Sequence, residues 1–474
     1  MTAVTAHRRK GQTLLSARYL PEQADRIALS ATARDAQSPH GAADVQHWLD
    51  ERRLAHTFRV DRIAFTALDG WSFAETGNLL HRSGRFFTVE GLHVTEVGEP
   101  YGDGPPHEWH QPVIRQPEIG ILGILAKEFH GVLHFLMQAK MEPGNANLVQ
   151  LSPTVQATRS NYTGAHRGSG VRYLEYFTRP GAGTVLADSL QSEHGAWFYH
   201  KSNRNMIIET DRDVPPHDDF RWLTLADLAG LLHQDNVVNM DARTVLACLP
   251  HRDPAPRALL SDVQLLSWFT GERSGRHVRA ETVPLAGLPG WKRGEYAIEH
   301  EEGRYFNVVA VSVVAGNREV PGWTQPLIEP VGRGLVAFLM RTFDGVPHVL
   351  LHARAEGGFL DTVELAPTVQ CVPANHSHLP PDQQPRFLAH ILTADPARVR
   401  YRVVHSEEGG RFRNAESDYL LVEAEEEHAP LVPPTGYIWA TPAQLTSLTR
   451  HGHYLNVQAR TLLACLHAAG VSPA

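Results

Sequence analysis

The sequence predicts a mixed α and β protein of the α+β class, made by tandem duplication of one unit of roughly 170 residues. Residues 351–370 repeat residues 137–156, with nine of twenty positions identical. Residues 456–465 repeat residues 239–248, with seven of ten positions identical. The matching blocks keep the same order in both copies, which indicates duplication.

Each copy combines predicted strands with predicted helices. Residues 85–97 alternate between apolar and polar side chains, as a half-buried strand does. Residues 120–142 form two apolar runs around His-Gly, and residues 333–356 form two around Asp-Gly, which is typical of hairpins. Residues 224–234 place leucines on one helical face, with Thr224 as the expected N-cap and a second helix beginning near Asp241.

A chain of 474 residues is too long for a single compact core. We expect a helical N-terminal extension over residues 1–65 and the first copy over residues 66–250. A linker that contains a helix is expected over residues 251–292, and the second copy over residues 293–474.

Composition excludes several classes of protein. The net charge of −8 argues against a nucleic-acid-binding protein, which needs a concentrated basic face. No run of apolar residues is long enough to span a membrane, and the N-terminus has no apolar segment of a secretory signal. The three cysteines have neither disulfide nor metal spacing, so we expect a cytoplasmic protein.

The block QAKME ends a predicted strand with polar side chains on one face. Gln138, Lys140 and Glu142 are spaced by two residues and therefore point the same way. A solvated edge is the alternative, but the Glu-Pro-Gly-Asn turn that follows favours a site. Only five of the 44 basic residues are lysines, which favours a chemical role for those that remain.

A second polar face follows in QLSPTVQ. Gln150, Ser152, Thr154 and Gln156 again have a spacing of two. This pattern is also typical of the solvent face of an ordinary strand. Hydroxyl and amide groups are, however, the neutral hydrogen-bonding groups that suit a sugar or a base edge.

Two further blocks collect charges and amides. KSNRN brings together Lys201, Asn203, Arg204 and Asn205, a composition that suits phosphate binding. The block NMDAR contributes Asp241 and Arg243. No dinucleotide fingerprint, Walker A motif, nucleophile elbow or His-Glu-x-x-His motif occurs, so we expect neither a cofactor nor a metal.

These blocks, in this order and with a degenerate second copy, resemble the NDP-hexose 2,3-dehydratases over about residues 55–470. The most specific segments are SPTVQATRSNY and the paired ARTVLAC and ARTLLAC. The resemblance implies two Nudix-like domains, a homodimer and a dTDP-sugar ligand in deoxysugar and antibiotic biosynthesis. The carboxylate-rich Nudix box is missing from both copies, so the implied fold lacks the metal chemistry of Nudix hydrolases.

The reaction implied by the resemblance is that of a hydro-lyase acting on dTDP-4-keto-6-deoxy-D-glucose. A base removes the C3 proton, which the C4 ketone acidifies, and an acid assists departure of the C2 hydroxyl. The product is a 3,4-diketo-2,6-dideoxy sugar nucleotide, which a downstream NADPH-dependent 3-ketoreductase would consume. No hydride moves in the dehydration, in agreement with the missing dinucleotide fingerprint.

The resemblance also suggests roles for individual residues. Lys140 and Glu142 are the expected acid/base residues of the first copy, and which of them is the acid and which the base is left open. Its expected substrate-binding residues are Trp109, Gln138, Gln150, Ser152, Thr154, Gln156, Arg159, Asn161, Tyr162, Lys201, Asn203, Arg204, Asn205, Asp241 and Arg243, with Arg159, Lys201, Arg204 and Arg243 at the diphosphate. A second nucleotide site is expected at Trp323, Arg354, Glu356, Glu364, Thr368, Gln370, Glu407, Arg411 and Arg460.

Two other functions remain open at this point. The chain could be a non-catalytic, duplicated nucleotide-sugar-binding protein, or an active Nudix-type pyrophosphatase. The missing carboxylate run disfavours the pyrophosphatase. The sequence does not decide which copy is catalytic.

Overall fold

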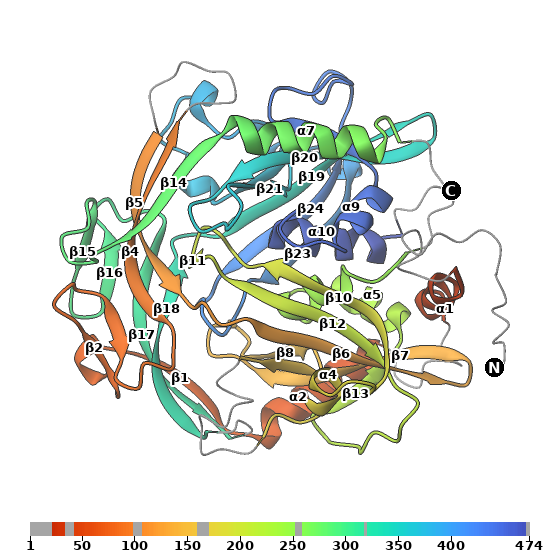
Figure 1. The fold of residues 1–474 in the computed structure, drawn as a ribbon, viewed down its shortest axis with the longest axis horizontal. Helices are drawn as coiled ribbons and strands as arrows, with labels where there is room; N and C mark the ends of the chain where they lie inside the picture. The colour runs from red at the N-terminus through yellow and green to blue at the C-terminus, as the bar shows by residue number, and fades with distance from the viewer. Residues whose placement is uncertain are drawn as a thin grey trace, which may run out of the picture.

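Two large sheets and two smaller ones form the protein (Figure 1). The computed structural model describes residues 21–33, 42–97, 107–158, 170–251, 258–316 and 320–470. The small sheets lie at the left of Figure 1 and the large ones at the right. Among the described helices, none combines the length and the apolar composition needed to cross a membrane.

The two large sheets have the same topology, which confirms the α+β class and the duplication. In both, a central parallel pair is flanked by antiparallel strands. The first contains β6 (Gly120–Phe129), β7 (Val132–Met141), β8 (Val149–Ser152), β9 (Val155–Ala157), β10 (Thr184–Ser192), β12 (Ser202–Glu209) and β13 (Phe220–Leu223). The second contains β19 (Gly334–Phe343), β20 (Val346–Ala355), β21 (Val363–Ala366), β22 (Val369–Cys371), β23 (Val399–Ser406), β24 (Glu416–Glu423) and β25 (Tyr437–Ala440).

Both predicted hairpins are present. His130 and Gly131 join β6 to β7, and Asp344 and Gly345 join β19 to β20. All four residues have positive φ angles, from 48° to 81°, as two-residue hairpin turns of this type require. The predicted strand over residues 85–97 is β4 (Thr88–Val97).

The two small sheets exchange their first strands. β1 (Phe58–Ile63) pairs with β17 (Phe306–Ala315) of the second copy. β14 (His277–Val283) pairs with β4 of the first copy. The remaining strands of these sheets are β2 (Trp71–Phe73), β3 (Leu79–His81), β5 (His107–Arg115) and β11 (Phe198–Tyr199) beside β4, and β15 (Trp291–Arg293), β16 (Ala297–His300) and β18 (Gly322–Pro330) beside β17.

This exchange was not predicted from the sequence. The expected helices of the N-terminal extension and the linker are present as α1 (Pro21–Ala31), α2 (Ala42–Ala55) and α7 (Asp262–Gly275). Each segment also supplies a strand, β1 or β14. Both strands are half-exposed and carry several charges, so their apolar alternation is weak.

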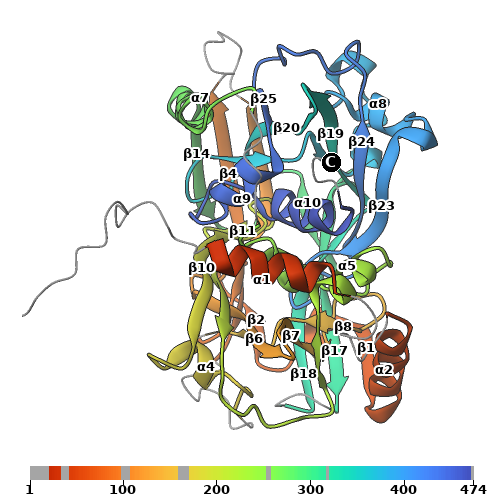
Figure 2. The ribbon, with the colours of Figure 1, turned by 90° about the vertical axis from the view of Figure 1, so that its right-hand side faces the viewer.

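Helices from the two copies meet between the large sheets. In Figure 2, α5 (Leu225–Leu232) and α10 (Val457–Ala468) lie between the first large sheet below and the second above. Thr224 caps α5 with a capping box, as predicted. Asn239 caps α6 (Met240–Leu246), the second predicted helix. The other helices are α4 (Glu175–Thr178), α8 (Leu388–Leu392) and α9 (Pro442–Leu448), with short 3₁₀ turns at residues 65–67, 373–375, 381–383 and 396–398.

The second copy's small sheet packs against the first copy's large sheet. Val309, Val311 and Val313 on β17 share one buried cluster with Ala139 and Met141 on β7. The tandem copies are therefore interlocked, and each functional site can draw residues from both.

Candidate active site

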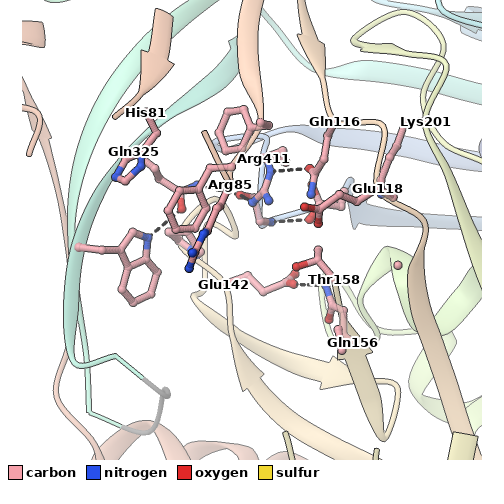
Figure 3. A pocket seen from close by; sticks show the side chains of 18 of the residues that line it. His81, Arg85, Gln116, Glu118, Glu142, Gln156, Thr158, Lys201, Gln325 and Arg411 are labelled. Atoms are coloured by element: carbon pink, nitrogen blue, oxygen red, sulfur yellow. Dashed lines mark hydrogen bonds between the residues drawn. The ribbon is translucent and has the colours of Figure 1, made fainter. Parts of the chain in front are cut away.

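A cavity of about 380 Å³ lies between the first large sheet and the small sheets (Figure 3). Residues of both copies line it. The lining includes six residues expected in the first copy's site, namely Lys140, Glu142, Gln156, Lys201, Asn203 and Asp241. Tandem duplication has thus produced a site to which the second copy also contributes, through Trp323, Gln325, Glu408 and Arg411.

Glu142 is held by several donors of the cavity wall. Gln156 Nε2 donates to Glu142 Oε1 over 2.6 Å, as Figure 3 shows, and Asn145 Nδ2 lies 3.4 Å from Oε2. Lys140 Nζ lies 3.9 Å from Glu142 Oε1. Strand alternation along β7 explains why Lys140 and Glu142 face the same way. Gln138 does not line the cavity; it pairs with Ser152 and Phe220 in the sheet.

A group of three carboxylates spans both copies. One oxygen each of Glu142, Asp241 and Glu408 lie within 4.8 Å of one another. Burial and the nearby carboxylates of Glu142 and Glu193 raise the pKa of Asp241 well above its usual value. Burial also raises the pKa of Glu408, to about 7. The cavity therefore places three carboxyl groups side by side, and the pKa values of two of them, Asp241 and Glu408, are raised.

Strand alternation divides the KSNRN block. Lys201 donates to Glu118 O in the cavity wall, and burial lowers the pKa of Lys201 to about 8. Asn203 Nδ2 donates to Glu193 Oε1 over 2.7 Å. Arg204, which was expected at the diphosphate, points the other way and pairs with Asp188 over 2.6 Å on an exposed surface outside the cavity lining.

Asn205 is also held away from the cavity. It is buried, and its amide lies 3.3 Å from Thr244 Oγ1. Alternation separates Arg204 from Asn203, whereas Asn205 has a spacing of two from Asn203. Asn205 lies further along β12, where it contacts Thr244 of α6 instead of lining the cavity.

Most polar side chains of the block QLSPTVQ bind other parts of the protein and do not line the cavity. Thr154 Oγ1 accepts from Leu125 N at 2.9 Å and donates to Leu136 O, which joins β6, β7 and the start of β9. Thr368 makes the same two contacts in the second copy. Both threonines, expected at the ligand, are buried and bind backbone groups outside the cavity lining.

Of this face, only Gln156 lines the cavity. Ser152 Oγ supports it by donating to Gln156 Oε1 at 3.2 Å. Gln150 instead accepts from Ser406 Oγ of the second copy at 2.8 Å. The segment is two short strands interrupted at Pro153, and each part pairs with a different neighbour.

Two buried arginines join the copies reciprocally. Arg243 is fully buried and donates to Val238 O and, over 2.6 Å, to Ser406 O of the second copy. Arg460 is its counterpart and donates to Leu455 O and to Ser192 O of the first copy. These guanidinium groups donate to carbonyls and have no exposed surface, so the structure places neither Arg243, expected at the diphosphate, nor Arg460, expected at the second nucleotide site, in the cavity lining.

Trp323 and Arg411 lie in the first copy's cavity, although we expected them in a second nucleotide site. Arg411 Nε donates to Gln116 Oε1 over 3.1 Å, and its guanidinium lies 4.4 Å from the Phe87 ring centre. Trp109, the counterpart of Trp323, does not line this cavity. The interlocking of the copies explains both corrections.

The second copy keeps part of the arrangement around Glu142. Arg354 Nε lies 2.7 Å from Glu356 Oε1, and Gln370 Nε2 lies 3.0 Å from the same oxygen. Glu407 is bound by His194 of the first copy over 2.8 Å. Glu364 accepts from Ser192 Oγ over 2.6 Å and so joins the copies, the counterpart of the Gln150 contact.

Sequence reasoning missed several residues that line the cavity. These are chiefly Trp71, Arg85, Phe86, Gln116, Glu118, Glu193 and Glu408. Glu193 and Glu408 lie in SEHGAWF and SEEGGRF, a repeated block that could have indicated them. The expected Arg159, Asn161 and Tyr162 lie outside the described residues.

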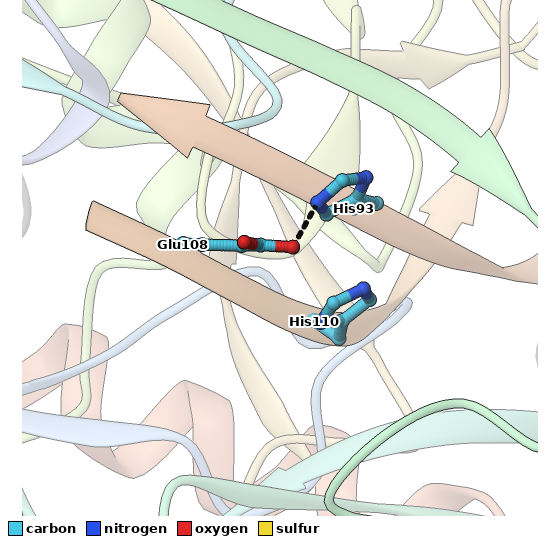
Figure 4. Close-up of side chains that lie close together, drawn as sticks. All are labelled: His93, Glu108 and His110. Carbon is cyan, nitrogen blue, oxygen red and sulfur yellow. Dashed lines mark hydrogen bonds and ion pairs between the residues drawn. The ribbon is translucent and has the colours of Figure 1, made fainter. Parts of the chain in front are cut away.

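A second group of ionisable side chains lies on the outer face of a small sheet (Figure 4). His93 on β4 and His110 on β5 stack with ring centres 4.4 Å apart. His93 Nε2 lies 2.7 Å from Glu108 Oε1. None of the three lines the cavity. The pairing register of β4 and β5 brings them together, and sequence spacing does not reveal that register.

Comparison with known proteins identifies the family. The model of the family described as NDP-hexose 2,3-dehydratase matches residues 42–249 and 262–466. The chain belongs to the NDP-hexose 2,3-dehydratase family. The two matched segments correspond to the two copies. The first segment begins before β1 and the second begins before β14, the two strands that the copies exchange.

Three curated relatives carry the name dTDP-4-dehydro-6-deoxy-alpha-D-glucopyranose 2,3-dehydratase. The protein from Amycolatopsis orientalis is 62% identical over 453 residues, which cover 95% of each chain. The protein from Saccharopolyspora spinosa is 50% identical over 89% of this chain and 90% of its own. The protein from Streptomyces violaceoruber is 48% identical over 88% of this chain and 95% of its own.

Proposed function

We propose that this family member is a dTDP-4-keto-6-deoxy-D-glucose 2,3-dehydratase that works in the cavity between the copies. The observation that carries the proposal is one cavity wall that holds a donor-supported carboxylate, a lysine and two further carboxyl groups with raised pKa values. The elimination needs a base, an acid and a cation, and candidates for all three line this cavity. The names of relatives at 48–62% identity support the same substrate.

Glu142 is the proposed base. Donors from Gln156 and Asn145 hold its carboxylate in the cavity wall, where it can accept the C3 proton of the sugar. Lys140 is the proposed donor to the C4 oxygen as negative charge develops there. Base catalysis contributes about 10²–10⁴-fold, and a donor to the oxyanion about 3–4 kcal/mol.

The cations of the cavity are the proposed diphosphate ligands. Arg85, Arg411 and Lys201 line the same cavity, and Figure 3 shows Arg85 and Arg411 on one side of Glu142. Guanidinium groups bind phosphate oxygens in pairs, which suits a diphosphate. We retain Arg159, Asn161 and Tyr162 as expected substrate contacts, while Trp323 replaces Trp109 as the aromatic candidate for stacking on thymine.

The second copy is proposed to bind a nucleotide sugar without converting it. Arg354, Glu356 and Gln370 keep the cation, carboxylate and amide of the first copy. The position of Lys201, however, is held by Ala415 in the aligned second block.

Other parts of the proposal concern the setting. We propose a cytoplasmic homodimer whose units derive from a Nudix-like fold without its metal box. Its diketo product would be reduced by an NADPH-dependent 3-ketoreductase in deoxysugar and antibiotic biosynthesis.

Incubation with dTDP-4-keto-6-deoxy-D-glucose, followed by mass analysis, tests the function. Loss of one water is the expected result. Release of dTMP would instead identify a pyrophosphatase. Saturable binding without any change of mass would identify a nucleotide-sugar-binding protein, and either result would contradict the proposal.

A further inference from the structure

The cavity holds more carboxyl groups than a single base requires. Besides Glu142, it contains Asp241 at the start of α6 and Glu408 from the second copy, with one oxygen of each within 4.8 Å of the others. Like charges at this separation in a buried site cannot all be ionised without a large cost. At least one of these groups therefore carries a proton or binds a cation.

Hydrogen bonding distinguishes the three groups. Glu142 has amide donors on both oxygens. Asp241 is only 3% exposed, and its Oδ1 has no hydrogen-bonding partner among the described residues. A buried oxygen without a donor is costly for an ionised carboxylate but acceptable for a carboxylic acid. Glu408 Oε2 also has no partner among the described residues, but Glu408 Oε1 accepts from Gly410 N over 2.9 Å. Of these two groups, Asp241 is therefore the better place for the proton.

The charged groups around Asp241 act in the same direction. Glu142 at the end of β7, Glu193 after β10 and Glu408 in the loop before β24 all raise its pKa, and burial raises it most. Lys140 alone opposes them. The second copy therefore contributes to the raised pKa of Asp241 in the first copy, because it places Glu408 in this cavity.

The second copy lacks this acid. In the aligned repeat, Gln458 stands where Asp241 does, and His194 stands where Glu408 does. His194 is fully buried against Glu407; burial alone would lower its pKa, but the hydrogen bond and charge of Glu407 raise it. Among the described residues, the first copy thus places Glu142 beside a carboxyl group with a raised pKa, and the aligned positions of the second copy hold Gln458 and His194 instead.

We propose that Asp241 is the catalytic acid that protonates the departing C2 hydroxyl, and that Glu408 is a positioning residue that keeps Asp241 protonated. This assignment rests on the proposed dehydratase function. The C3–H bond breaks and its proton goes to Glu142, leaving an enolate on C3, C4 and the C4 oxygen. The enolate electrons then form the C2–C3 double bond, while the C2–O bond breaks and the oxygen takes the Asp241 proton to leave as water.

Tautomerisation restores both groups. The enol hydroxyl on C3 returns a proton to Asp241, and Glu142 delivers its proton to C2. No oxidant, reductant or additional co-reactant is needed, so each turnover begins with Asp241 neutral and Glu142 ionised.

The test separates proton removal from departure of the hydroxyl. In Asp241→Asn, dehydration should fall about 10²–10⁴-fold because the acid is lost. Exchange of the C3 hydrogen with deuterium oxide should continue, because Glu142 is intact. The variant should also eliminate fluoride from the 2-deoxy-2-fluoro substrate at close to the wild-type rate, since fluoride leaves without protonation. Asp188→Asn, which removes an exposed carboxylate paired with Arg204, is the matched control with unchanged activity.

Glu408→Gln tests the positioning role through the pH profile. Loss of its negative charge should lower the pKa of Asp241, so the alkaline limb of kcat/KM should move to lower pH while C3 exchange persists. An unmoved limb would contradict the role of Glu408.

For Asp241, loss of C3 exchange together with dehydration, or dehydration at the wild-type rate, would overturn the assignment. Loss of wild-type activity in EDTA with recovery in Mg²⁺ would show that the carboxylates hold a metal and would also overturn it. A wild-type protein that leaves the substrate unchanged would instead refute the proposed function.

Discussion

Replacing Arg243 with methionine should destabilise the protein without acting on substrate binding directly. The fully buried guanidinium donates to Val238 O and to Ser406 O, and methionine fills the space of the stem while removing both donors. A hydrogen bond from a charged group contributes about 1.5–3 kcal/mol, so two contribute about 3–6 kcal/mol. We expect the free energy of unfolding to decrease by about 3–6 kcal/mol, because both carbonyls remain buried without a donor.

Urea unfolding followed by tryptophan fluorescence measures this loss. Arg204→Met is the control, because its exposed pair with Asp188 should contribute at most about 1 kcal/mol. The substrate KM of folded Arg243→Met should remain near the wild-type value. A variant with wild-type stability but a strongly raised KM would refute the tethering role and restore Arg243 as a diphosphate ligand.

Three further predictions address packing, charge and metals. Gly144→Ala should unfold at clearly lower urea, because an added Cβ would lie 1.7 Å from Phe412 O, whereas Gly271→Ala in α7 meets nothing within 4 Å and should be neutral or stabilising. The KM of the wild type should rise as pH increases through about 8, because Lys201 loses its charge there, and Lys201→Arg should remove this rise; a variant that keeps the pH dependence would show that Lys201 does not bind the diphosphate. Treatment with EDTA should leave the dehydration rate unchanged, and a loss reversed by Mg²⁺ would reinstate metal chemistry.

Local patterns in the sequence were sufficient to predict the repeated unit. The hairpins at His130 and Asp344 and the capped helix after Thr224 follow from turn chemistry, apolar periodicity and capping, which act over a few residues. Lys140 and Glu142 could likewise be placed together, because both lie on one face at the end of β7.

Contacts between the copies could not be predicted in the same way. The exchange of β1 and β14 depends on partners at least 180 residues away, and it decides that Arg411 and Trp323 line the first copy's cavity. Arg243 illustrates the same difficulty. A polar block suggested a ligand, whereas the Arg243 guanidinium binds Val238 O of its own copy and Ser406 O of the second copy. Residue type alone does not distinguish an arginine that binds phosphate from one that binds carbonyls.

Steady-state kinetics of Lys140→Met and Arg354→Met test most directly that the chemistry occurs in the first copy's cavity. Lys140→Met should lower kcat about 10²–10³-fold, because a donor to the developing C4 oxyanion is lost. Arg354→Met should weaken binding at the second copy while kcat falls much less. If Arg354→Met is the inactive variant and Lys140→Met keeps a kcat near that of the wild type, the active site lies in the second copy and the central claim is wrong.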